Sequence, residues 1–180
     1  GAQETALLDN LSLGDVSNPG DGTGSVGWTY DVPNSEIDFL GAGETVILTF
    51  TVEIDDGNGG SDTQNVEITI TGTNDGPVID GDGEPQTGSI TESVDSYPGA
   101  DADPADATGT ITFADVDLSD THTASILAGA TVSGGSAILT AGQATALLDN
   151  LSLGSVSNPG DGTGSVGWTY DVANSEIDFL

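Results

Sequence analysis

The first 40 residues of the chain return almost unchanged as residues 141–180, and we call these two copies module 1 and module 2. They differ only at Gly1/Ala141, Ala2/Gly142, Glu4/Ala144, Asp15/Ser155 and Pro33/Ala173. So little drift at a fixed offset of 140 residues predicts a tandem array with that period. The chain is expected to span just over one period of the array, and the function is expected to belong to the array as a whole.

The charge of the chain restricts its partners. It carries 30 acidic side chains and one His, but no Lys or Arg. Two carboxylates about 4 Å apart near a protein surface repel by roughly 4 kcal/mol, so a compact fold is expected to need external cations. Nucleic acids and anionic membranes are disfavoured as partners because phosphate recognition uses Lys and Arg. Basic partners and divalent metal ions remain compatible with the charge.

Composition excludes several other classes. Apolar residues make up 35% of the chain and alternate regularly, which argues against disorder. No stretch approaches the roughly 20 apolar residues of a membrane-spanning helix, so no membrane insertion is expected. The chain has no Cys or Lys nucleophile, and its single His fits no recognisable spacing with Ser and Asp. It is therefore predicted not to be an enzyme.

A long hairpin is the clearest local prediction. In Thr45–Ile54 every second residue is apolar, the pattern of a half-buried strand, and Val66–Ile70 repeats it. The intervening Asp55–Asp62 is rich in turn-forming residues, so the two strands are expected to pair.

Further candidate strands recur about every ten residues. They are Val26–Val32, Gly88–Glu92, Gly109–Ala114, Thr121–Leu127, Ala130–Ser133 and Ser136–Thr140, whereas Thr5–Leu13 favours helix or irregular structure. This spacing predicts an all-β fold, a β-sandwich of the immunoglobulin or cadherin type repeated in a linear array. Trp28 and Tyr30, with their copies Trp168 and Tyr170, are expected to anchor the core; the alternative is an exposed aromatic platform for sugars.

The repeat boundary is expected within the chain. Thr71–Pro77 (TGTNDGP) is predicted to be an ordered linker, and the interdomain linker is placed at residues 72–80. Residues 1–75 would then be the C-terminal part of one repeat, and residues 76–180 the N-terminal and middle part of the next. The strands that should follow residue 180 would come from a longer chain or, by strand addition, from another copy in a head-to-tail assembly.

Several motifs resemble a known family. Phe39–Ile79, with GAGET, DGNGG and TGTNDGPV, resembles the end of a VCBS repeat running into the next, as in large RTX-type surface adhesins of Gram-negative bacteria. Gly88–Ser93 (GSITES) and Gly109–Ile126, with DVDLSDTH, resemble the opening strands of the following repeat. The resemblance implies cadherin-like tandem domains that calcium stiffens at their junctions, on the bacterial cell surface or outside the cell.

The resemblance also implies calcium ligands. Matched to the cadherin junction pattern, these are Glu44, Asp56, Asn74, Asp75, Glu92, Asp115 and Asp117. The sequence departs from that pattern in TGTND and in GAGE, which leaves the number of ions per junction open.

The chemistry of the acidic side chains also favours calcium ligands, independently of the family resemblance. Calcium takes six to eight oxygen ligands at about 2.3 to 2.6 Å. The DVDLSD loop supplies Asp115, Asp117 and Asp120, although its spacing is not that of an EF-hand. Because no cationic side chain is expected to pair them, ligation is favoured for Asp115 with Asp117 and for Glu44 with Asp75. Solvated turns are favoured for Asp95, Asp101, Asp103 and Asp106, and His122 is expected to be an ordinary strand residue.

The predicted function is that of a structural extender repeat in a secreted or cell-surface adhesin or an extracellular filament, rigidified by calcium. Its partners would be neighbouring copies of the same repeat, and any glycan or cell-surface ligand would bind elsewhere in the full protein. The alternative is a calcium-dependent carbohydrate-binding module in which Trp28, Tyr30 or Tyr97 stacks on sugar rings.

Overall fold

The computed structural model describes residues 2–81, 84–94, 104–133 and 138–179. It divides into two compact units, of which unit 1 comprises Gly1–Gly76 with Val116–Ser119, and unit 2 comprises Pro77–Asp115 with Asp120–Leu180. All paired strands are antiparallel, and the helices are short. The predicted all-β fold class is confirmed.

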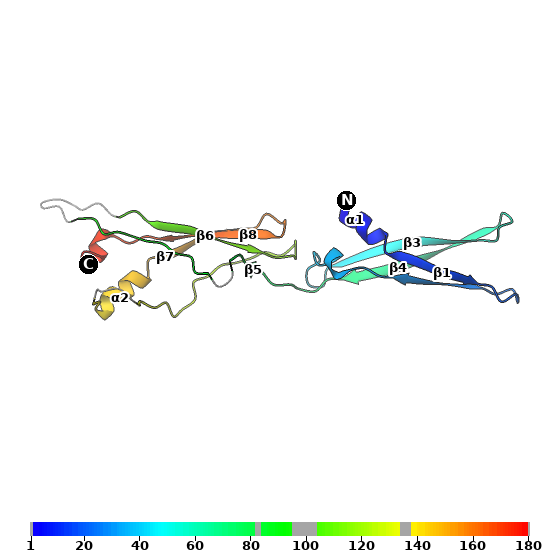
Figure 1. The fold of residues 1–180 in the computed structure, drawn as a ribbon, viewed down its shortest axis with the longest axis horizontal. Coiled ribbons are helices and arrows are strands. Elements are labelled where there is room, and N and C mark those ends of the chain that lie inside the picture. The colour runs from blue at the N-terminus through cyan, green and yellow to red at the C-terminus, as the bar shows by residue number, and fades with distance from the viewer. Residues whose placement is uncertain (1, 82–83, 95–103, 134–137, 180) are drawn as a thin grey trace. The chain divides into compact units, whose positions relative to one another are not determined.

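Unit 1 contains two hairpins (Figure 1). Its elements, in chain order, are α1 (Ala2–Leu8), β1 (Leu11–Ser17), β2 (Ser25–Tyr30), the 3-10 turn η1 (Asn34–Glu36), β3 (Thr45–Asp55) and β4 (Ser61–Thr71). β3 and β4 pair without a register shift from Thr45↔Thr71 to Asp55↔Ser61, which confirms the predicted long hairpin. Positive φ angles at Gly57 (72°) and Gly59 (98°) let the chain reverse between these strands.

The core of unit 1 lies between module 1 and the β3–β4 hairpin. Leu7 and Leu40 of the module pack with Leu48 and Ile70 of the hairpin, and all four side chains are at most 7% exposed. The alternation of β3 explains this arrangement, because it places Leu48 on the core side while the neighbouring Ile47 is 65% exposed.

Unit 2 is built around one four-stranded sheet with strand order β5-β6-β8-β7. Its elements are β5 (Val78–Ile79), β6 (Ala107–Ala114), α2 (Ala141–Leu148), β7 (Leu151–Ser157), β8 (Thr163–Tyr170) and the 3-10 turn η2 (Asn174–Glu176). β6 pairs with β8 over its whole length, from Ala107↔Tyr170 to Ala114↔Thr163. The predicted strand at Gly109–Ala114 is therefore confirmed.

The two modules have the same internal structure. In each, a helix precedes a hairpin with one bulge, and a 3-10 turn follows. The Tyr30 hydroxyl donates to the Leu7 carbonyl at 3.0 Å, and Tyr170 donates to Leu147 at 2.6 Å. Because the modules have different neighbours in their units, this local structure is determined by their shared sequence.

Three predicted strands are not strands in the structure. Gly88–Glu92, Thr121–Leu127 and Ala130–Ser133 belong to no ladder among the described residues, and neither do residues 138–140 of the predicted Ser136–Thr140 strand. Alternating polarity sets which face a segment buries, but a ladder also needs a partner backbone. In Thr5–Leu13, helix α1 ends at Leu8 and strand β1 begins at Leu11, so the sequence pattern missed this strand.

Candidate functional site

The eight predicted calcium ligands are distributed over both units. Glu44, Asp56, Asn74, Asp75 and Asp117 lie in unit 1, and Glu92, Asp115 and Asp120 lie in unit 2. Within unit 1, Glu44 precedes β3 and Asp56 follows it. Eleven strand residues span about 35 Å, so these two carboxylates cannot bind the same ion within one unit.

Asp75 and Asp117 are in contact although they are 42 positions apart in the sequence. The backbone N–H of Asp75 donates to Oδ2 of Asp117 at 2.8 Å, and Asp117 is only 2% exposed. Nearby, the Leu118 N–H donates to the Phe39 carbonyl at 3.4 Å. The buried Asp117 carboxylate therefore fixes the backbone at Asp75.

Glu44 and Asn74 make local hydrogen bonds. Glu44 Oε2 accepts from the Gly41 N–H at 3.0 Å, while the Glu44 carbonyl accepts from the Gly72 N–H at 2.9 Å. The Asn74 side chain donates to the carbonyl of Asp75. Both side chains are exposed and so remain open to further ligands.

Asp56 organises the turn between β3 and β4. Its Oδ1 accepts from the Asn58 N–H at 2.7 Å and from the Gly60 N–H at 3.0 Å. These donors, Gly60 first, lower the pKa of Asp56 because they stabilise its ionised form. Turn formation alone accounts for an Asp at this position.

His122 pairs with Asp115, which corrects two expectations. His122 lies outside any strand, and its Nε2 is 2.8 Å from Asp115 Oδ2, while its Nδ1 is 2.9 Å from Asn158 Oδ1. Its ring centroid lies 4.7 Å from that of Phe113. The premise that no cationic side chain can pair Asp115 was therefore wrong, since a protonated His122 does so.

This pair predicts a pH effect on unit 2. Hydrogen bonding to Asp115, and then to Asn158, raises the pKa of His122. A group whose pKa is higher in the folded state contributes stability that is complete below its unfolded pKa, about 6.5, and is lost as pH rises through the folded pKa. We expect the stability advantage of the native chain over His122→Gln to be larger at about pH 5.5 than at about pH 8. Urea unfolding at both values measures it.

Comparing the two proteins at each pH removes the general effect of protonating carboxylates, which both share. If the stability advantage of the native chain over His122→Gln is the same at both pH values, or is larger at about pH 8, then His122 is not protonated beside Asp115 in the folded protein.

The eight residues do not assemble a ready metal site. Over the described ranges, no three His, Asp or Glu side chains form a group that could hold an ion. Asp117 instead accepts a backbone hydrogen bond and Asp115 faces His122. The described geometry therefore does not fit a preformed calcium cage, and no coordination geometry follows from it.

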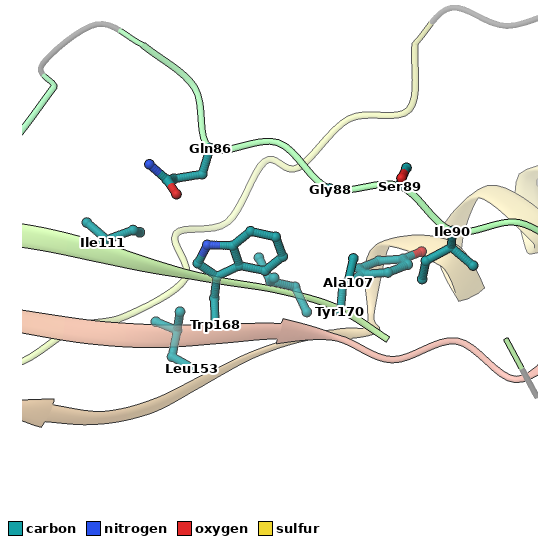
Figure 2. A pocket seen from close by; sticks show the side chains of 10 residues that line it. Gln86, Gly88, Ser89, Ile90, Ala107, Ile111, Leu153, Trp168 and Tyr170 are labelled. Carbon is teal, nitrogen blue, oxygen red and sulfur yellow. The ribbon is translucent and has the colours of Figure 1, made fainter. Parts of the chain in front are cut away.

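Trp168 lies in an apolar hollow of unit 2 (Figure 2). The hollow has a volume of about 440 Å³ and extends from β7 and β8 to the segment that carries Gln86 and Ile90. Trp168 is half-buried, and a Cβ added to Gly109 would lie 2.5 Å from three of its ring atoms. Its Nε1 is buried without a hydrogen-bond partner among the described residues.

The expectation that both tryptophans anchor the core is wrong for Trp28, which is 49% exposed, whereas Trp168 is half-buried against Gly109 of β6. Trp28 has no β6 strand beside it, so its ring stays open to solvent. A flat sugar-binding platform requires an open ring face, and Gly109 occupies that position on Trp168. Tyr97, Asp95, Asp101 and Asp103 lie outside the described residues.

In the part of the chain that the structure describes, no helix is both long enough and apolar enough to cross a membrane.

Residues 3–69 match the family model described as a bacterial Ig domain. The matched stretch runs from α1 into β4, and module 2 repeats its first half. No curated protein and no solved structure matches the chain. The match agrees with an immunoglobulin-like fold and does not name the VCBS repeat or the cadherins.

Proposed function

We propose, from the bacterial Ig domain match, that this chain is part of a structural extender of a bacterial surface or secreted protein, of the kind found in large adhesins. The observation that carries the proposal is the repeat itself. A 40-residue module returns after 140 residues and folds in the same way in two units with different neighbours. Selection for nearly identical units suits a protein whose reach depends on copy number.

The shape of the paired strands suits this role. The strands of the β3–β4 hairpin have 11 residues each, which corresponds to about 35 Å of length. A repeat of this size adds a few nanometres to an array, and the length of the array grows linearly with the number of repeats. Bacterial Ig domains usually occur in surface or secreted proteins, which supports an extracellular location.

We include calcium in the proposal because of charge. A formal net charge of −30 without Lys or Arg makes successive repeats repel one another, and divalent cations reduce that repulsion most effectively. Exposed carboxylate and amide oxygens such as those of Glu44 and Asn74 are the ligands that calcium prefers. The ion would thereby stiffen the array.

A chain of several periods tests this proposal. In about 1 mM calcium we expect its largest dimension, measured by small-angle X-ray scattering, to grow by a constant increment per period. In chelator the same chains should become more flexible, and the melting temperature should fall by about 5 °C or more. Sodium chloride at matched ionic strength is the control for simple screening.

Variants separate ligation from charge. Asp75→Asn and Asp62→Asn remove the same charge, one at a predicted ligand and one near the start of strand β4. The calcium-dependent rise in melting temperature should shrink only in the first. Equal stabilisation by calcium and by sodium chloride would refute calcium ligation, whereas a length that does not scale with copy number would refute the extender role.

A further inference from the structure

The turn that joins β3 to β4 (Figure 1) carries the only Asn–Gly pair of the chain, Asn58–Gly59. An asparagine can lose its side-chain amide without an enzyme when the backbone nitrogen of the next residue attacks the amide carbon. A following glycine helps, because it has no side chain to block the approach and its backbone adopts conformations closed to other residues. In a folded protein the structure around the attacking nitrogen decides whether the reaction proceeds.

The attacking nitrogen of Gly59 is not held by a hydrogen bond. Asp56 Oδ1 accepts from the Asn58 N–H at 2.7 Å and from the Gly60 N–H at 3.0 Å. Among the described residues, the N–H of Gly59, which lies between them, has no acceptor, and Gly59 is outside the β3–β4 ladder. A hydrogen-bonded N–H must give up its acceptor before its nitrogen can attack, and Gly59 avoids that cost.

The turn also leaves room for a cyclic intermediate. A Cβ built on Gly57 (φ 72°) or on Gly59 (φ 98°) would meet no heavy atom within 4 Å. The Asn58 side chain is exposed, and its Nδ2 donates to the Asp56 carbonyl at 3.0 Å. Water can replace this exposed hydrogen bond at little cost, so the amide is free to rotate towards the Gly59 nitrogen.

The other asparagines lack one or more of these features. Asn74 is also exposed, but the N–H of the following Asp75 donates at 2.8 Å to the buried carboxylate of Asp117. Asn18 and Asn158 precede Pro, whose nitrogen carries no proton to lose. The remaining asparagines precede Leu, Ser or Val, whose side chains crowd the nitrogen. Sequence and structure together therefore single out Asn58.

We propose that Asn58 is a site of spontaneous deamidation. The Gly59 nitrogen loses its proton and forms a bond to Cγ of Asn58, while the Cγ–Nδ2 bond breaks and Nδ2 leaves as ammonia with that proton. The product is a succinimide ring. Water then opens the ring, at Cγ to give an ordinary aspartate or at the backbone carbonyl carbon to give isoaspartate. The net reaction consumes water and releases ammonia, without an oxidant, a reductant or an enzyme.

Deamidation changes both the charge and the geometry of the turn. It adds a negative charge to a turn that already carries Asp55 and Asp56, and it removes the Nδ2 donor that bonds the Asp56 carbonyl. The isoaspartate product also lengthens the main chain inside the turn. The hairpin end thus becomes more acidic as the protein ages. This inference is independent of the extender role, because the reaction needs only the turn and water.

Peptide mapping of the aged chain tests the inference. A protease that cleaves after aromatic residues releases Thr51–Tyr97, which contains Asn58, Asn65 and Asn74. The native chain is kept in mildly alkaline buffer and digested briefly, and mass spectrometry measures the fraction of each asparagine that has become a carboxylic acid. We expect this fraction to grow at Asn58, as aspartate and isoaspartate, while Asn65 and Asn74 keep their amides.

Anion-exchange chromatography of the intact chain gives a second readout. The native chain should convert with time to a later-eluting form, and Asn58→Asp should elute at that position from the start. Asn58→Gln should remain a single species, because attack on its longer side chain would close a larger and less favourable ring. Asn74→Gln is the matched control and should age as the native chain does. Circular dichroism checks that each variant is folded.

Unfolding in urea separates the effect of the fold from that of the local sequence. It releases the Asp75 N–H from Asp117, so the rate at Asn74 should rise more than the rate at Asn58. Incubation of the folded chain continues until a synthetic peptide of residues 54–63 has lost most of its amide in the same buffer. If Asn58 still keeps its amide in the folded chain at that time, the turn protects it and the inference is wrong. Equal rates at Asn58 and Asn74 in the folded chain would also contradict it.

Discussion

Replacing Gly109 by Val is expected to destabilise unit 2 by about 3 kcal/mol, because the new side chain would occupy the space of the Trp168 ring. A Cβ at Gly109 would already lie 2.5 Å from Cε2, Cζ2 and Nε1 of that indole. Val has a higher strand propensity than Gly, so the backbone gains while the packing is lost. The expected loss of stability therefore comes from steric overlap with the Trp168 ring.

The matched control is Gly167→Val on the adjacent strand of the same sheet. A Cβ at Gly167 meets nothing closer than the Gly109 carbonyl oxygen, at 3.9 Å. Urea unfolding of both variants in the Trp28→Phe background, followed by Trp168 emission, measures the difference. If Gly109→Val unfolds at the same urea concentration as Gly167→Val, the packing of Trp168 on β6 is not a source of stability.

Leu48→Ala is expected to cost unit 1 about 2 to 5 kcal/mol. Leu48 is 7% exposed and joins the β3–β4 hairpin to Leu7 and Leu40 of module 1. Truncation removes buried apolar surface and leaves a cavity that the surrounding side chains refill only in part. A loss of this size approaches the whole stability of a small unit.

Ile47→Ala serves as the control, because this neighbouring side chain is 65% exposed on the opposite face of the same strand. We expect it to change the stability by less than about 1 kcal/mol. Hydrogen exchange of the β3 and β4 amides, read by mass spectrometry, separates unit 1 from unit 2. Equal protection in both variants would mean that the module and the hairpin do not share a core.

Local patterns in the sequence were sufficient for much of the fold. The alternation in Thr45–Ile54 and Val66–Ile70, with a glycine-rich turn between them, predicted a hairpin whose strands pair without a register shift. β1 was missed because LSLGDVS mixes Ser and Gly into a strand that is mostly exposed. Gly88–Glu92 was predicted as a strand because its pattern describes a face, whereas a ladder depends on a partner elsewhere in the chain.

The same distinction applies to the candidate site. The hydrogen bonds of Asp56 are local and follow from its turn sequence. The contact of Asp75 with Asp117 joins residues 42 positions apart, and no periodicity encodes it. The pairing of His122 with Asp115 also depends on where an irregular loop returns to the sheet. Charge and composition could therefore name acidic residues but not their partners.

In the β3–β4 hairpin, the first residue of β3 pairs with the last residue of β4, and this pairing has a mechanical consequence. Gly43 and Glu44 exchange backbone hydrogen bonds with Gly72, and Thr45 faces Thr71, so a pulling force enters and leaves this hairpin at the same end. Such a load peels the ladder one pair at a time instead of shearing all pairs together. Release of Thr45–Thr71 would add roughly 90 Å of contour length. A hairpin of this kind would then unfold under tension and re-form when the load falls.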